Sequence, residues 1–218
     1  MGVIANIKNR VMEGSRRAKI EHFYSLVDPQ FGTPRILDVG VSPELGQGGP
    51  HMNYFLQTFR YDDAAYTGLG VEDLSATRAR YTGKQLVEYG GGRFPFDDSS
   101  FTHAFSNAVI EHVGDEQAQI DFVNEMARVA RTVFFTTPNK FFPIESHTNA
   151  VLVHWSDERF RRWCAKHNPY WTSDNLYLFS YARLRGLLMN TRVRDWHIQV
   201  NRLAGWPMTF SVVCRRQR

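Results

Sequence analysis

Two acidic positions near the ends of apolar runs could hold a cationic or hydroxylated ligand. Asp38 lies at the carboxyl end of the short run 36–39, and Gly40 opens the turn that follows. A glycine at this point lets a ligand approach the backbone, where a Cβ would block it. A carboxylate beside that glycine suits an ammonium group or ribose hydroxyls better than it suits a pyrophosphate.

Glu72 and Asp73 provide the second acidic position, after the apolar run that begins at Ala65. A carboxylate at the end of a second strand can accept hydrogen bonds from both hydroxyls of a ribose. Either residue could do so, although the distance in sequence from Gly40 exceeds the roughly 20 residues of a tight strand–helix–strand unit. We expect these acids and Asp38 to meet at the carboxyl edge of one sheet, where α/β proteins bind ligands.

Glu145 and His147 indicate a different chemistry. A carboxylate near an imidazole raises its basicity and fixes its tautomer, so the pair could act as a general base. A hydrogen-bonded corner that ties the loop to the sheet is an equally good interpretation. His112 is a second candidate base, for which an orienting or packing role is the more frequent alternative.

Apolar patterning predicts the elements that must position these residues. Short apolar runs bounded by glycine, proline and polar residues predict strands, and apolar residues at helical intervals predict helices. The expected strands are 36–39, 65–75, 85–89, 101–107, 131–136, 193–200 and 209–214, and the expected helices are 3–27, 51–59, 115–128, 159–166 and 180–190. Strands that alternate with helices predict an α/β fold.

The composition is that of one soluble domain with a full core, because 43% of the 218 residues are hydrophobic and 14% are aromatic. The net charge is +4, and much of the excess comes from both ends of the chain, including Arg16, Arg17 and Lys19. We interpret these residues as solvated, with attraction to nucleic acid or membrane as the lesser alternative. The two cysteines form no pattern, and neither a signal sequence nor a long apolar run is present, so a cytoplasmic protein is expected.

Several stretches resemble motifs of class I S-adenosylmethionine-dependent methyltransferases. Residues 35–43 resemble the first motif, hydrophobic-Leu-Asp-x-Gly-x-Gly-x-Gly, although Ser42 and Glu44 stand where later glycines usually fall. Residues 68–75 resemble the second motif, with Asp73 in its acidic place. Residues 94–115 resemble the Leu-Pro-Phe-x-Asp-x-Ser-Phe-Asp and hydrophobic-Glu-His-Val motifs of the type 11 small-molecule subgroup.

This resemblance implies a Rossmann-like, seven-stranded, mostly parallel sheet with helices on both faces and an antiparallel C-terminal edge strand. Residues 1–218 would form a single methyltransferase domain. Within it, residues 1–30 would be a helical cover over the pocket, and residues 139–180 would be an inserted substrate loop and lid.

The resemblance also implies S-adenosyl-L-methionine as the methyl donor. The residues expected to bind it are Asp38, Gly40, Ser42, Glu72, Asp73, Arg93 and Asn107. Relatives often bind the adenine through an acid after the third strand; none follows Glu88, so Arg93 could stack on the base instead. The expected reaction is O-methylation of a sugar, a glycolipid or a secondary metabolite, with His147 as base, Glu145 as its orienting partner and His112 as second candidate. No metal is expected, because the sequence shows no ligand set at a convincing spacing.

Two other functions stay open. A nicotinamide-dependent dehydrogenase would need a Gly-x-Gly-x-x-Gly turn, which residues 42–44 do not provide. A non-catalytic partner protein could keep the fold without binding the donor. We expect a small-molecule acceptor, no nucleic-acid partner and no stable membrane insertion, and we leave a homodimer open.

Overall fold

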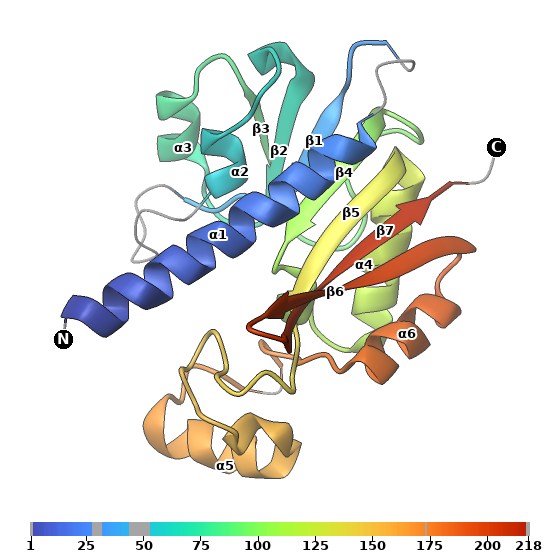
Figure 1. Ribbon diagram of the computed structural model, residues 1–218. Helices are drawn as coiled ribbons and strands as arrows, with labels where there is room; N and C mark the ends of the chain where they lie inside the picture. The colour runs from blue at the N-terminus through green and yellow to red at the C-terminus, as the bar shows by residue number, and fades with distance from the viewer. Residues whose placement is uncertain (1, 28–31, 44–52, 173, 217–218) are drawn as a thin grey trace.

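Seven strands form one sheet in the order β3-β2-β1-β4-β5-β7-β6 (Figure 1). The computed structural model describes residues 2–27, 32–43, 53–172 and 174–216, with side chains of the first helix described from Glu13 onward. The strands are β1 Ile36–Val39, β2 Tyr66–Gly70, β3 Gln85–Glu88, β4 Phe101–Asn107, β5 Ala130–Pro138, β6 Asp195–Leu203 and β7 Trp206–Arg215.

The first five strands are parallel, and β7 runs antiparallel to both of its neighbours, β5 and β6. A two-residue turn joins β6 to β7, and both of its residues, Ala204 and Gly205, have positive φ. Such turns match the twist of paired antiparallel strands. The expected fold is therefore confirmed, with β6 at the edge and the antiparallel strand β7 one place inside it.

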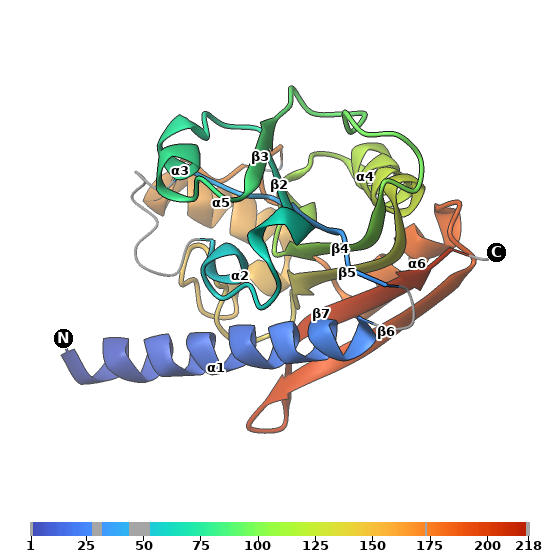
Figure 2. The ribbon, with the colours of Figure 1, turned by 90° about the horizontal axis from the view of Figure 1, so that it is seen from above.

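Helices cover both faces of the sheet. The helices are α1 Gly2–Leu26, α2 Tyr54–Gln57, α3 Ser75–Arg80, α4 Glu116–Val129, α5 Asp157–His167 and α6 Tyr181–Asn190. Helices α1 and α2 lie on one side of the sheet and α4 and α6 on the other (Figure 2). Side-chain oxygens of Asp115, Ser156 and Ser180 accept hydrogen bonds at the first turns of α4, α5 and α6, which fixes where these helices begin.

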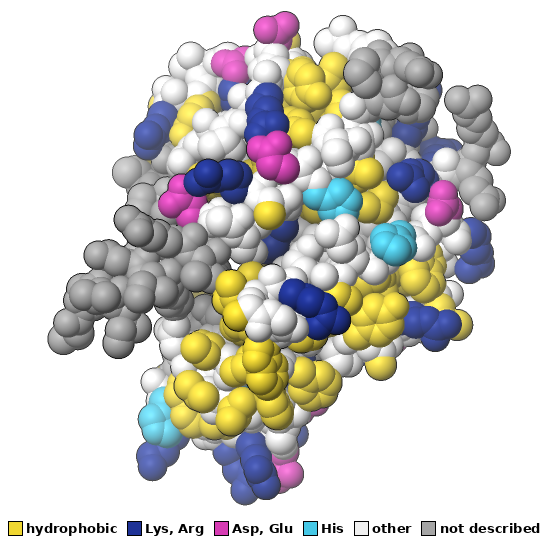
Figure 3. Space-filling model, viewed as in Figure 1, with side chains coloured by type: hydrophobic (Ala, Val, Ile, Leu, Met, Phe, Trp, Pro, Cys, Tyr) yellow, Lys and Arg dark blue, Asp and Glu magenta, His cyan; other side chains and the backbone are white. Residues whose placement is uncertain are grey.

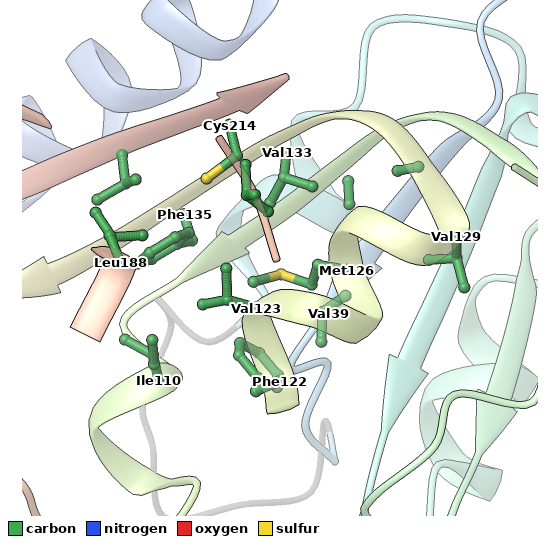
Figure 4. Close-up of a cluster of buried hydrophobic side chains, with 14 of the residues drawn as sticks. Val39, Ile110, Phe122, Val123, Met126, Val129, Val133, Phe135, Leu188 and Cys214 are labelled. Carbon is green, nitrogen blue, oxygen red and sulfur yellow. The ribbon is translucent and has the colours of Figure 1, made fainter. Parts of the chain in front are cut away.

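The sheet has a hydrophobic core on each face, because alternate strand residues point in opposite directions. Phe134 packs with Phe23 of α1 in one core. Phe135 packs in the other core with α4 residues that include Val123 and Met126 (Figure 4). The strands are thus buried from both sides, which fixes the position of the side chains at their ends.

Residues 139–180, here called the cap, lie beside the carboxyl ends of the parallel strands and include α5 (Figure 1). The cap has a small core of its own, made by Ala150, Phe160, Cys164, Leu176 and Leu178. Hydrophobic side chains also gather on its outer surface (Figure 3), where the exposed ones include Phe141, Ile144, Val151, Leu152 and Trp155.

The structure departs from the sequence expectations at the second strand. The second expected strand ends at Gly70 rather than continuing to Ser75, so Glu72 and Asp73 lie in a turn beyond the sheet. Glu44 and the glycine-rich loop 46–50 lie outside the described residues, as does the start of the helix expected over 51–59, whose described part is α2. Among the described helices, none combines the length and the apolar character needed to cross a bilayer.

Candidate functional site

A cavity of about 770 Å³ lies where the carboxyl edge of the sheet, helix α1 and the cap come together. Seven of the residues expected from the sequence to bind or react contribute to its lining. They are Asp38, Gly40, Ser42, Asn107, His112, Glu145 and His147. The cavity is therefore the candidate active site.

Asp38 is a buried acid in the lining of the cavity. The Tyr66 hydroxyl donates a hydrogen bond to its Oδ2 atom at 2.5 Å. Burial raises the pKa of Asp38 to about 7, and the hydrogen bond from Tyr66 only partly opposes that shift. A carboxyl group in this state gains most from a cationic partner, because a positive charge would offset the cost of ionising it in a buried site.

The turn after β1 requires a glycine at position 40 and places Ser42 in the lining of the cavity. Gly40 has a φ of 103°, and a Cβ placed on it would lie 2.2 Å from Cγ2 of Val109. Asn53 clamps the next part of the turn, because its side chain accepts a hydrogen bond from Ser42 N at 3.0 Å and donates one to Ser42 O at 2.8 Å. Asn53 also lines the cavity, and sequence reasoning missed it because it follows the glycine-rich loop without a recognisable motif.

Helix α1 contributes two cations, Arg16 and Lys19. The Lys19 side chain is buried, and its Nζ lies 3.5 Å from Oδ1 of Asn107, which also accepts a hydrogen bond from Thr136. Burial lowers the pKa of Lys19 to about 8. The interpretation of Lys19 as a solvated residue is wrong, because the helix turns this position toward the sheet; Arg17 does lie on the exposed side.

Glu145 and His147 form the expected pair. Glu145 Oε1 lies 2.7 Å from Nδ1 of His147, and Oε2 accepts hydrogen bonds from the backbone N of His147 and from the N and Oγ1 of Thr148. Burial opposes the charge of Glu145, but these bonds outweigh it and lower its pKa to about 2. Burial likewise opposes the charge of His147, yet its hydrogen bond to Glu145 and the nearby Glu111 raise its pKa.

His112 contacts His147 in the lining of the cavity. The Nε2 atoms of the two imidazoles lie 3.1 Å apart, and Nδ1 of His112 lies 2.8 Å from the carbonyl oxygen of Asn175. Glu111 is buried beside them, with Oε1 4.0 Å from His147 Nε2. Glu111 belongs to the recognised Glu-His-Val motif, but nothing in the sequence alone indicates that the cap folds over it.

Three expected donor-binding residues do not line this cavity: Glu72, Asp73 and Arg93. Asp73 is exposed, and its Oδ1 accepts a hydrogen bond from Ser75 N at 2.8 Å at the start of α3, a bond that also lowers the pKa of Asp73. Glu72 is exposed in the same turn, and Arg93 lines a separate, shallow hollow with residues 94–97. The structure therefore brings Asp38 to the cavity without the two acids that follow β2.

Residues 44–132 match a family model described as a methyltransferase domain. The match covers less than half of the chain, and it shows that this segment is similar to a methyltransferase domain. This confirms the resemblance noted in the sequence, since the matched segment includes the second motif and the Glu-His-Val motif. The cavity lies at the edge of the sheet to which the matched segment contributes strands, and the cap lies beyond that segment.

Several solved structures of methyltransferases share the fold of this chain. A S-adenosylmethionine-dependent methyltransferase from Methanosarcina mazei is 15% identical, with a TM-score of 0.56 over 89% of this chain and 96% of its own. A possible histamine N-methyltransferase from Thermotoga maritima is 13% identical, with a TM-score of 0.57 over 97% and 96%. The N-terminal domain of EvdMO1, solved in the presence of S-adenosylhomocysteine and D-fucose, is 16% identical, with a TM-score of 0.54 over 90% and 81%. No curated protein matches the sequence.

Proposed function

We propose that this protein transfers the methyl group of S-adenosyl-L-methionine to a hydroxyl oxygen of a small molecule. The observation that carries the proposal is one cavity that joins the first motif of the domain to a carboxylate–imidazole pair in the cap. The acceptor classes that we favour are a sugar, a glycolipid or a secondary metabolite. The similar EvdMO1 domain, solved with a sugar present, supports the first of these.

The donor side of the cavity is the sheet edge around Asp38, Ser42 and Asn107. The buried Asp38 fits a cationic donor, because a neighbouring positive charge favours the ionised carboxylate. S-adenosylmethionine supplies an electrophilic methyl group that an acceptor can attack directly. The protein then has to hold the acceptor in line with that methyl group and exclude water from the cavity.

The acceptor side is the cap. His147 is held by Glu145, so its Nε2 atom points away from the carboxylate and toward His112. An imidazole fixed in this way can accept the proton that an attacking hydroxyl loses. His112 is the second candidate for that role. Its Nδ1 faces the carbonyl oxygen of Asn175, and its Nε2 faces Nε2 of His147.

The function is tested by incubating the purified chain with donor labelled in its methyl group and a panel of sugars, glycolipids and phenols. We expect label in at least one acceptor and a stoichiometric yield of S-adenosylhomocysteine. The His147→Ala variant should retain donor binding and lose roughly 10²–10⁴-fold in rate. The exposed His167→Ala variant serves as the matched control.

A non-catalytic, methyltransferase-fold protein is the competing function, and the exposed positions of Glu72 and Asp73 favour it. Mass spectrometry of the nucleoside released from the purified protein separates the two. Donor or its demethylated product supports the enzyme, whereas no bound nucleoside and no calorimetric binding of added donor would support the competitor. The cytoplasmic location and the homodimer stay predictions.

A further inference from the structure

We propose that Glu111, His112 and His147 bind a divalent metal ion of the zinc or cobalt type at the acceptor side of the cavity. One ligand atom from each of these residues lies within 4.8 Å of the other two. This convergence was not expected from the sequence, because His147 is in the cap and the other two residues follow β4. The binding of a metal does not rest on the proposed methyl transfer.

The tautomers of the two imidazoles are the first argument. Nδ1 of His112 faces a backbone carbonyl oxygen at 2.8 Å, and Nδ1 of His147 faces a carboxylate oxygen at 2.7 Å. Both partners can only accept a hydrogen bond, so both Nδ1 atoms carry the proton. In the neutral rings, each Nε2 then presents a lone pair, and these two lone pairs face each other at 3.1 Å.

The buried carboxylate of Glu111 is the second argument. Only 1% of Glu111 is exposed, and its Oε2 accepts a hydrogen bond from Thr137 Oγ1 at 2.9 Å. Its Oε1 has no hydrogen-bond partner among the described residues, and it is this atom that lies 4.0 Å from His147 Nε2. Buried carboxylates are rarely left without a partner, and Lys19 interacts with Glu111 through its charge without a hydrogen bond to Oε1. The unpartnered oxygen near the Nε2 lone pairs therefore fits a bound cation.

The distances suit a metal ion. Two imidazole nitrogens bound to one zinc ion at about 2.0–2.1 Å lie roughly 3.0–3.4 Å apart, which includes the observed separation of 3.1 Å. The Glu111 oxygen lies 4.0 Å from His147 Nε2, and all three ligand atoms lie within 4.8 Å of one another, so it has to move toward the two nitrogens by up to about an ångström to complete the set.

The surroundings also resemble those of metal ligands. Histidines that bind metals usually donate their other N–H to a carboxylate or a backbone carbonyl, and Glu145 and Asn175 are such acceptors here. Two imidazoles and one carboxylate leave open positions on the metal, and these would face the cavity. A hydroxyl or carbonyl oxygen of the acceptor could bind there; this second step rests on the proposed function.

With a metal bound, both Nε2 lone pairs are occupied, so neither imidazole acts as a base in that form. A single proton shared between the two Nε2 atoms is the competing explanation of the same geometry. It would make one ring cationic without any metal, and it is therefore an outcome of the test.

The test is calorimetric titration of the full-length, chelator-treated protein with ZnCl₂, followed by the absorption spectrum with CoCl₂. We expect one ion per chain and a visible cobalt spectrum. The affinity should fall more than roughly 100-fold in His112→Ala and in His147→Ala, and it should fall clearly in the nearly isosteric Glu111→Gln. The His167→Ala variant, which removes an exposed histidine, should bind like the wild type.

A measurement on the wild type alone covers the case in which a variant fails to fold. Nitrogen-15 spectra of the histidine rings, recorded before and after zinc, should shift two Nε2 signals together with one equivalent of metal. The proposal is overturned if no ion binds, if His112→Ala and His147→Ala bind zinc as the wild type does, or if zinc leaves these signals unchanged.

Discussion

The sheet and the cap hold their parts of the candidate site by different means. Asp38 lies in β1, which is paired with β2 and β4 and covered by apolar side chains on both faces of the sheet. Glu145 and His147 lie in the cap, which has only a small apolar core. The loop that carries them is ordered by hydrogen bonds to the Glu145 carboxylate. The donor side is thus fixed by the fold as a whole, and the acceptor side by local polar contacts that can change without unfolding the sheet.

The largest expected effect is on stability, and it separates the two regions. Phe134 is fully buried in β5 and stacks on Phe105, so Phe134→Ala should lower the free energy of unfolding by about 3–5 kcal/mol. Phe160 belongs to the small core of the cap, so Phe160→Ala should loosen the cap and leave the main transition of the sheet nearly unchanged. Guanidinium unfolding followed by circular dichroism measures both. An equal loss in both variants would mean that cap and sheet unfold as one unit.

The next effect concerns the polar network of the cap. Glu145→Gln replaces one of the two acceptor oxygens by a donor, so the bonds to His147 and Thr148 cannot all form. We expect the rate of methyl transfer to fall roughly 10- to 100-fold, with an unchanged melting temperature of the sheet. The control is Glu158→Gln, which alters an exposed ion pair with Arg162. A collapse of the whole fold in Glu145→Gln would contradict the local role of this carboxylate.

The pH dependence of donor binding tests the role of Asp38 at the edge of the sheet. The pKa of Asp38 is about 7 in the folded protein and 3.8 in its ordinary state. Its protonation therefore stabilises the fold below pH 3.8, and this contribution is lost as the pH rises toward 7. A cationic donor favours the ionised form, so binding near or below pH 7 should release a proton, and the affinity should rise up to about tenfold per pH unit in that range.

Calorimetry in two buffers with different ionisation enthalpies counts the proton released on donor binding. The Asp38→Asn variant cannot release it, so its affinity should be weak and nearly independent of pH. A wild-type affinity that does not change between pH 5.5 and 7.5 would remove Asp38 from the donor site.

The strands and the nearest contacts could be predicted from the sequence. The segments 36–39 and 101–107 are short and bounded by turn residues, and both are strands with these bounds. Glu145 and His147 are two residues apart, so their contact depends only on local chain geometry. In these cases, residues that are close in sequence determine the structure, so the sequence pattern is enough to predict it.

The long-range parts of the site could not be predicted in the same way. His112 and His147 are 35 residues apart and meet only because the cap returns to the sheet edge. Lys19 has the charge of a solvated residue, and its burial depends on which side of α1 meets the cavity. Gly70, the last residue of β2, packs against the turn after β1, where a Cβ would lie 2.3 Å from the carbonyl oxygen of Val41, and neither segment alone indicates this approach.

The smallest expected effect is that of Asp73→Ala, the variant for which the sequence motif alone predicts a large one. Asp73 is exposed, accepts a hydrogen bond from Ser75 N and does not line the cavity. We therefore expect calorimetric titration to show that donor affinity changes by less than about threefold, as for other surface substitutions. A loss as large as that of Asp38→Asn would mean that the turn after β2 moves onto the donor when it binds, and the ribose would then be held by both strand ends after all.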